Sequence, residues 1–150
     1  MNFQENYLSN VKFEFQRYKT MGNATFAQIS DDDIHWKYVE TDNSIAIIVK
    51  HMVGNMLSRW TDFLTEDGEK SWRERDLEFE KPYTTKTEML SAWEKGWKCL
   101  FDALESIDSA NIESKVIIRG EEHTIIEAIN RQLAHYASHV GQIVFVAKLI

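Results

Sequence analysis

The sequence predicts an all-α protein, a four-helix bundle with one short β-hairpin between its third and fourth helices. Apolar residues recur every three or four positions through four long segments, the periodicity of helices that bury one face. The chain has one proline and six glycines in 150 residues, so these segments contain few helix breakers. One stretch between the last two segments instead has strand-like residues around a glycine. The length suits a single domain over residues 1–150.

The first two helices are expected over residues 3–27 and from about Ser44 to Thr65. The first has an apolar face of Phe3, Tyr7, Val11, Phe15 and Tyr18, and the second one of Ile45, Ile48, Met52, Met56, Trp60 and Phe63. Between them, the acidic run 31–33 is interpreted as a loop and helix cap, because it lacks the alternating ligands and glycine of a calcium loop. The charged stretch 66–81 is expected to be a solvated connection that contains one short helical turn.

The third helix is expected to begin at the capping box Thr85-x-x-Glu88 and to continue to about Ile107. Its apolar stripe includes Trp93 and Trp97, which we interpret as core residues. The alternative is that the two indoles wall a ligand pocket, since pockets are rich in aromatic side chains.

The β-hairpin is predicted from residues 115–118 and 122–124, turning at Gly120, with His123 at its surface. A second capping box, Thr124-x-x-Glu127, opens the fourth helix, which extends to about Lys148. That helix has two adjacent stripes, one apolar and one containing Gln132, His135 and His139. A helix with two such stripes contacts two neighbours, so the histidines are expected to face the bundle interior.

Three histidines form the candidate metal site. His135 and His139 are four residues apart and lie one turn apart on one helix face. His51, midway along the second helix, is the natural third ligand, and three imidazoles leave a coordination position open. Asn55 and Gln132 are each one turn from a histidine and could orient it. The competing interpretation is three ordinary interior histidines, and the absence of His-Glu-x-x-His disfavours a metalloprotease.

Composition excludes several classes of function. The net charge of −7 argues against a nucleic-acid partner and against attachment to anionic membranes. The longest apolar run, residues 45–49, is far too short to span a membrane. The lone Cys99 and the polar N-terminus indicate a cytoplasmic protein, with Cys99 an inert, partly buried thiol.

The chain resembles the DinB-like superfamily of metal-binding four-helix bundles, in particular a small bacterial branch. The matching blocks are SIAIIVKHMVGN at 44–55, SRWTDFL at 58–64, IRGEEHT at 118–124 and AINRQLAHYASHVGQI at 128–143. The likeness spans nearly the whole chain. It implies that His51, His135 and His139 bind one divalent metal ion, for which zinc and nickel are the leading candidates.

The resemblance also implies a metal-dependent thiol S-transferase, related to bacillithiol- and mycothiol-dependent enzymes, that joins a small-molecule thiol to an electrophile. Arg59 could then hold a carboxylate of the thiol, or simply lie in a surface ion pair. Two alternatives remain open, a metal-dependent hydrolase and a non-catalytic metal-binding stress protein. Aromatic residues outside the core stripes, Trp36, Trp72 and Tyr83, favour a homodimer.

Overall fold

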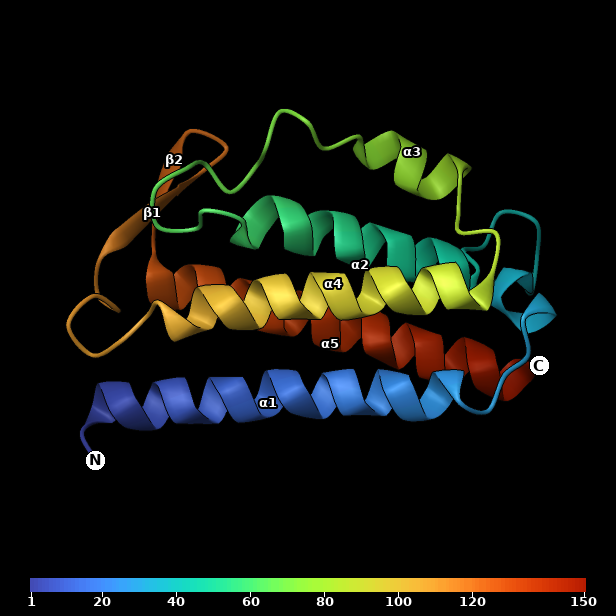
Figure 1. Cartoon of the computed structure of the whole chain (residues 1–150), viewed down its shortest axis with the longest axis horizontal. Helices are drawn as coiled ribbons and strands as arrows, with labels where there is room; N and C mark the ends of the chain where they lie inside the picture. The colour runs from blue at the N-terminus through green and yellow to red at the C-terminus, as the bar shows by residue number, and fades with distance from the viewer.

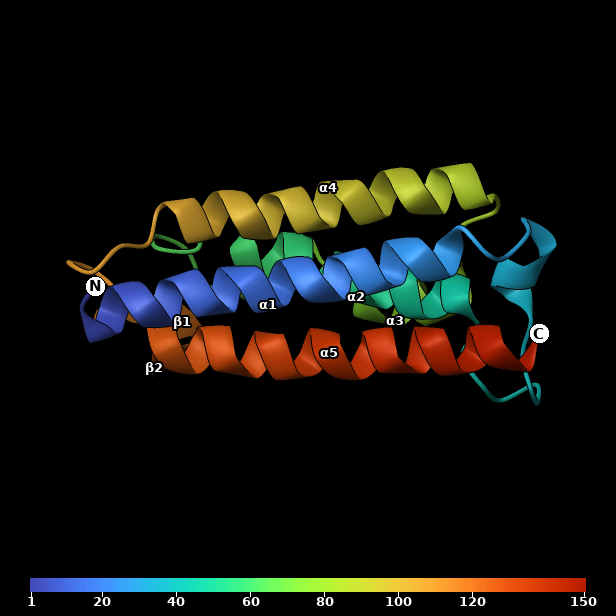
Figure 2. The same cartoon turned by 90° about the horizontal axis from the view of Figure 1, so that it is seen from below.

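Four long helices lie side by side along the long axis of the computed structural model, which describes residues 1–150 (Figure 1). They are α1 (Phe3–Phe26), α2 (Ile45–Trp60), α4 (Lys86–Glu105) and α5 (Ile125–Leu149). Figure 2 shows α1 between α4 and α5, and α2 packs against both α4 and α5. None of these helices is both long and apolar enough to cross a membrane.

The four helices begin at side-chain caps. The side chains of Asn2, Ser44, Thr85 and Thr124 each accept a hydrogen bond from a backbone N–H in the first turn. Thr124 and Glu127 form the predicted reciprocal capping box. At the start of α4 the carboxylate of Glu88 instead accepts from the N–H of Thr84, so only half of the predicted box is present.

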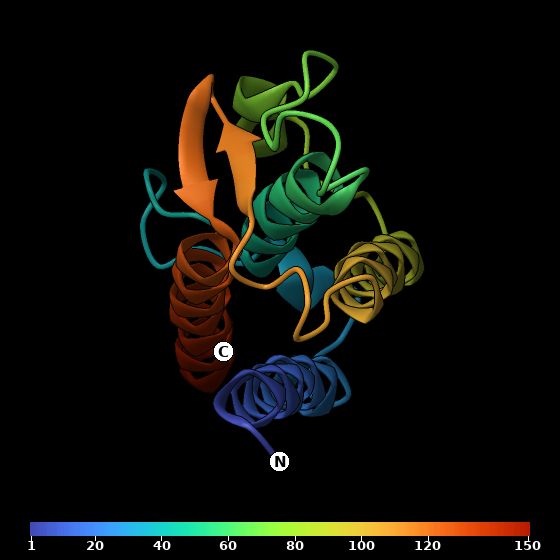
Figure 3. The ribbon, with the colours of Figure 1, turned by 90° about the vertical axis from the view of Figure 1, so that its left-hand side faces the viewer.

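The shorter elements lie around α2 and the ends of the long helices (Figure 3). They are a 3-10 turn, η1 (Asp32–His35), a short helix, α3 (Arg75–Glu80), and the strands β1 (Lys115–Ile118) and β2 (Glu121–Thr124). The strands pair antiparallel, with Ile118 opposite Glu121. Arg119 and Gly120 make the turn with φ values of 55° and 77°, the left-handed region that hairpin turns require.

The hairpin is tied to the connection that follows α2. The carboxylate of Asp67 accepts hydrogen bonds from the backbone N–H groups of Arg119 and Gly120, both at 2.8 Å. On the face of β1 that packs on the helices, Val116 and Ile118 are buried. An isolated two-stranded hairpin is marginal in water, so this packing within the chain stabilises it.

Three sequence-based boundaries or placements were wrong. Helix α2 ends at Trp60 rather than near Thr65, because Thr61 is extended and Asp62 has a φ of 48°. The acidic run was expected to be a loop and cap, but only Asp31 lies at a cap position, and Asp32 and Asp33 form the first half of η1. Phe3, placed on the apolar face of the first helix, is 73% exposed.

An aromatic cluster fills the space between the long helices. The ring of Phe15 lies 6.1 to 6.4 Å from those of Trp60, Trp97 and Tyr136. Trp93 packs edge-on against Trp97 and Phe26. Both α4 tryptophans are completely buried, as their core interpretation predicts.

The aromatic residues expected at the surface divide into two groups. Trp72 is 56% exposed, whereas Trp36 and Tyr83 are only half-buried against the rest of the chain. Tyr83 lies beneath the ammonium group of Lys50, 5.4 Å from it. The three side chains therefore do not all belong to one exposed apolar surface.

Candidate metal centre

His51, His135 and His139 come together where α2 and α5 pass each other. The Nε2 atom of His135 lies 3.4 Å from that of His51 and 2.9 Å from that of His139. Each of the three histidines has a ring nitrogen within 4.8 Å of a ring nitrogen of both others. Two histidines on one turn of α5 and a third from α2 thus direct nitrogen atoms at one point, as the sequence predicted.

The remaining nitrogen of each ring, Nδ1, faces an oxygen atom. His51 pairs with Oε1 of Glu78 at 3.1 Å, His135 with Oε1 of Gln132 at 3.3 Å, and His139 with Oε1 of Gln142 at 2.8 Å. Each oxygen accepts a hydrogen bond when Nδ1 carries the ring proton. In that tautomer all three Nε2 lone pairs point at the common centre, and none can donate to another.

This donor set fits a divalent metal ion. Ligand nitrogens about 2.0–2.1 Å from a tetrahedral ion lie roughly 3.3 Å apart, close to the separation between His51 and His135. Three facing lone pairs repel one another unless a cation lies between them. Oxygen partners on the far ring nitrogens are also what metal-binding histidines usually have. The three residues are therefore placed to bind one ion and to leave a further coordination position open.

Burial keeps the two histidines of α5 in the neutral form that binds metal. Burial lowers the pKa of His135 to about 3, and the neighbouring His139 and His51 lower it further in the same direction. Burial also lowers the pKa of His139, although its hydrogen bond with Gln142 acts in the opposite direction. Both rings are therefore neutral at neutral pH, and in the tautomer with the proton on Nδ1 their Nε2 atoms are available to a metal.

Glu78, on α3, is the important residue that the sequence interpretation missed. Its carboxylate accepts two hydrogen bonds from Arg73, both at 3.0 Å, as well as the bond from His51. Burial alone would raise the pKa of Glu78, but the hydrogen bonds from His51 and Arg73 outweigh it and lower the pKa. The stretch predicted to be a solvated connection therefore supplies a buried charged group to the site.

The site lies at the edge of the helical core rather than in its centre. His135 and His139 are partly exposed, whereas Tyr136 and Val140 on the neighbouring stripe of α5 are completely buried. Helix α3 packs on α2 beside His51, and the ring of Phe79 lies 5.1 Å from that of His51. The prediction that the histidines face the bundle interior was wrong, because the aromatic core already fills that space.

The other predicted site residues differ in where they lie. Gln132 is hydrogen-bonded to His135, as expected, but Asn55 accepts from the hydroxyl of Tyr136 at 2.6 Å and forms no hydrogen bond with the three imidazoles. Trp97 and Trp93 lie in the aromatic core and line neither the cavity beside His51 and His135 nor the cavity beside Gln142.

Arg59 is buried, being only 3% exposed, so its alternative as a surface ion pair is wrong. Its Nε donates to the carbonyl of Gly68 at 3.2 Å, and its Nη1 has no hydrogen-bond partner. Burial lowers the pKa of Arg59 from its usual value.

Two further residues lie away from the three imidazoles. His123 is on β2, opposite Val116. Cys99 is half-buried on α4, with its thiol 3.5 Å from the hydroxyl of Thr61. Neither residue belongs to the metal-binding group.

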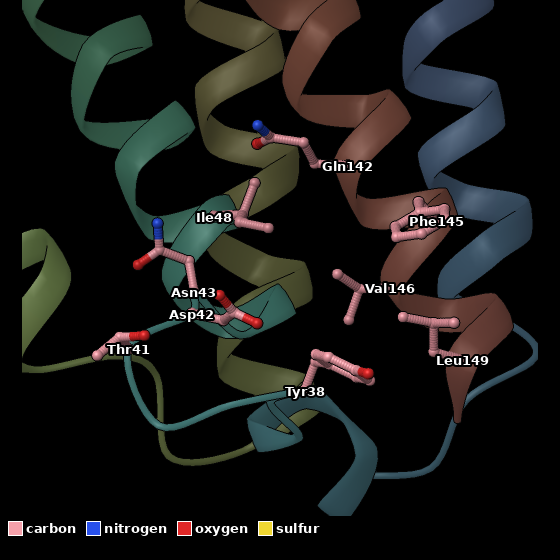
Figure 4. A pocket seen from close by; sticks show the side chains of 9 residues that line it. All are labelled: Tyr38, Thr41, Asp42, Asn43, Ile48, Gln142, Phe145, Val146 and Leu149. Carbon is pink, nitrogen blue, oxygen red and sulfur yellow. The ribbon is translucent and has the colours of Figure 1, made fainter.

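One cavity borders two of the histidines, and a second cavity lies next to the hydrogen-bond partner of the third. One, of about 300 Å³, has no apolar lining residue and includes His51, His135 and Arg59. The other, of about 570 Å³, lies toward the C-terminal end of α5 and includes Gln142, the partner of His139 (Figure 4). Figure 4 shows Phe145, Val146 and Ile48 directed toward the space of this second cavity.

Replacing Gly54 by alanine is expected to weaken metal binding by about 10- to 100-fold. A Cβ atom at this position would lie 2.6 Å from Cδ of Glu78 and would displace the carboxylate that orients His51. Gly141→Ala is the matched control, since its Cβ would meet no atom within 4 Å. Competition with a metal-sensitive dye measures both affinities. Wild-type affinity in Gly54→Ala would show that metal binding does not need Glu78 in this position.

The fold and the site define a mostly helical protein with a small two-stranded sheet and three clustered histidines that can bind a metal ion. Residues 2–150 match the family described as Protein of unknown function (DUF1572), and the chain belongs to this family. No curated protein and no solved structure matches the chain.

Proposed function

We propose that this protein is a metal-dependent thiol S-transferase with the four-helix architecture of the DinB-like superfamily. The observation that carries the proposal is the convergence of three Nε2 atoms whose Nδ1 partners are all oxygen atoms. Imidazole ligands suit zinc and nickel, which are the ions we propose. A divalent ion with an open position supplies thiolate at neutral pH, because it lowers the pKa of a thiol.

The surroundings of the histidines suit a reaction between two different substrates. A polar cavity opens beside His51 and His135, and a more apolar cavity lies beyond His139, next to Gln142. The polar cavity would bind the thiol, and the apolar cavity would hold the electrophile away from water. Proximity of this kind replaces a bimolecular encounter by a reaction between bound groups.

The proposed reaction is a substitution. The thiol sulfur forms a bond to the electrophilic carbon, the bond to the leaving group breaks with its electron pair, and the thiol proton passes to solvent. Gln132, Gln142 and Glu78 keep the imidazoles oriented throughout. Hydrolysis is less well supported, because the nearby carboxylate of Glu78 is already engaged by Arg73 and His51 and is not available as a general base.

The test is consumption of a thiol by a model aryl halide, followed with zinc- or nickel-loaded protein. We expect metal-dependent conjugation with glutathione, cysteine or bacillithiol, and a loss of at least about 100-fold in His139→Ala. His123→Ala, which changes a histidine outside the site, is expected to retain the wild-type rate. Equal rates with and without metal would contradict the proposal, and metal-dependent ester cleavage without thiol consumption would favour a hydrolase.

A further inference from the structure

The polar cavity beside the histidines is lined by five arginines and by no carboxylate. Its nine lining residues include no apolar side chain. The arginines come from α2, from α3 and the segment before it, from the hairpin turn and from α5, and they are Arg59, Arg73, Arg75, Arg119 and Arg131. Five cations around a space of about 300 Å³ are unexpected in a chain with a net charge of −7.

Carboxylates from outside the cavity neutralise only two of these arginines. Arg73 is held by Glu78 through two hydrogen bonds, and Arg119 lies 3.4 Å from Glu69. These two guanidinium groups are fixed in place by protein acids. They contribute shape and hydrogen-bond geometry to the wall of the cavity more than net charge.

The other three arginines have no acidic partner. Arg75 lies over the ring of Phe79 at 5.5 Å, and Arg131 forms no ion pair. Arg59 is only 3% exposed, and its Nη1 is a buried donor without an acceptor. Leaving a buried charged donor unpaired is costly, so an acceptor supplied from outside the chain would be strongly favoured.

We propose that this arginine cavity binds the anionic end of the substrate, a carboxylate or phosphate group of a small molecule. Guanidinium groups recognise both anions through paired N–H donors. Because His51 and His135 line the same cavity, an anion held there places the rest of the ligand beside the metal-binding nitrogens. That the anionic group belongs to the thiol substrate rests on the proposed function. The binding of an anion by the arginine cavity does not depend on it.

The recessed position of Arg59 favours a small molecule over a nucleic acid. Nucleic-acid surfaces spread basic residues along an exposed face, and the net charge of −7 opposes a polyanion of that size. Here the cations surround a recess, and Arg59 is buried within its wall.

Isothermal titration with inorganic phosphate, succinate and neutral succinamide tests the proposal at constant ionic strength. The protein is used as purified and again after metal removal, so that binding through a metal is separated from binding through arginine. We expect one site for phosphate, succinate or both, with a dissociation constant below about 1 mM, and none for succinamide. Phosphate alone would identify a phosphorylated ligand, and succinate alone a carboxylate ligand.

Arg131→Gln and Arg75→Gln are the informative variants, because both side chains are exposed and the fold does not depend on them. Each is expected to weaken anion binding at least 10-fold. The matched control is Arg17→Gln, which removes the same charge from α1, where Arg17 pairs with Glu14, and should change binding less than 2-fold. No anion binding by the wild type, or an equal loss in Arg17→Gln, would overturn the proposal.

His139→Ala separates this inference from the proposed transferase activity, because His139 does not line the arginine cavity. We expect this variant to lose metal and thiol transfer but to bind the anion within about 3-fold of the wild type. Anion binding without thiol transfer in the wild type would sustain the cavity and reject the transferase. Thiol transfer without anion binding would sustain the transferase and reject the anion-binding cavity.

Discussion

His135→Ala is expected to abolish the binding of about one equivalent of zinc or nickel, with an affinity loss greater than 100-fold. His135 is the central ligand, since its Nε2 lies within 3.4 Å of the corresponding atom of both other histidines. Loss of a residue that merely orients a ligand typically costs about 10- to 100-fold, so loss of a ligand should cost more. Elemental analysis of protein purified without an affinity tag measures the effect.

The matched control is His123→Ala, which removes a histidine from the hairpin and should leave the metal content unchanged. Metal bound at about 100 times its dissociation constant stabilises a folded protein by about 2.7 kcal/mol, so the wild type should also melt several degrees higher with metal than without. His135→Ala should show no such increase. A wild type that takes up no metal after dialysis against zinc or nickel would leave the three residues as structural histidines.

Trp97→Ala is expected to destabilise the protein by about 3–5 kcal/mol, the usual cost of removing a large buried aromatic side chain. The indole is completely buried and packs against Phe15, Tyr136 and Phe101. For a domain of this length the melting temperature should fall by roughly 10 °C or more. Urea or thermal unfolding measured by circular dichroism gives both quantities.

Trp72→Ala is the control for this prediction. It removes the same side chain from a position that is 56% exposed, and should change stability by less than about 0.5 kcal/mol. A small effect of Trp97→Ala on stability together with a large effect on ligand binding would instead support the interpretation of Trp97 as a pocket wall.

The positions of the long helices along the chain were largely predictable from local sequence. Apolar periodicity and capping residues are encoded within each segment, and Ser44, Thr85 and Thr124 cap the helices that they were expected to begin. The end of α2 was less predictable, because the apolar stripe continues to Phe63 although the backbone turns at Asp62. The side chains of Ser58 and Arg59 hold the returning chain at Gly68, a tertiary contact that periodicity does not reveal.

The three histidines of the candidate metal centre were predicted from the sequence alone. His135 and His139 share a helix face through their spacing, and His51 lies at a matching depth on α2. Gln132 was also identifiable, being less than one turn from His135.

Only the tertiary structure decided what surrounds these ligands. Glu78 reaches His51 from a charged segment 27 residues further along the chain, and the five arginines of the cavity come from separate segments. No short-range periodicity relates such positions, because chain folding alone brings them together. Sequence therefore determined which nitrogens can bind a metal, whereas packing of α3 and the hairpin against α2 and α5 determined the charges beside them.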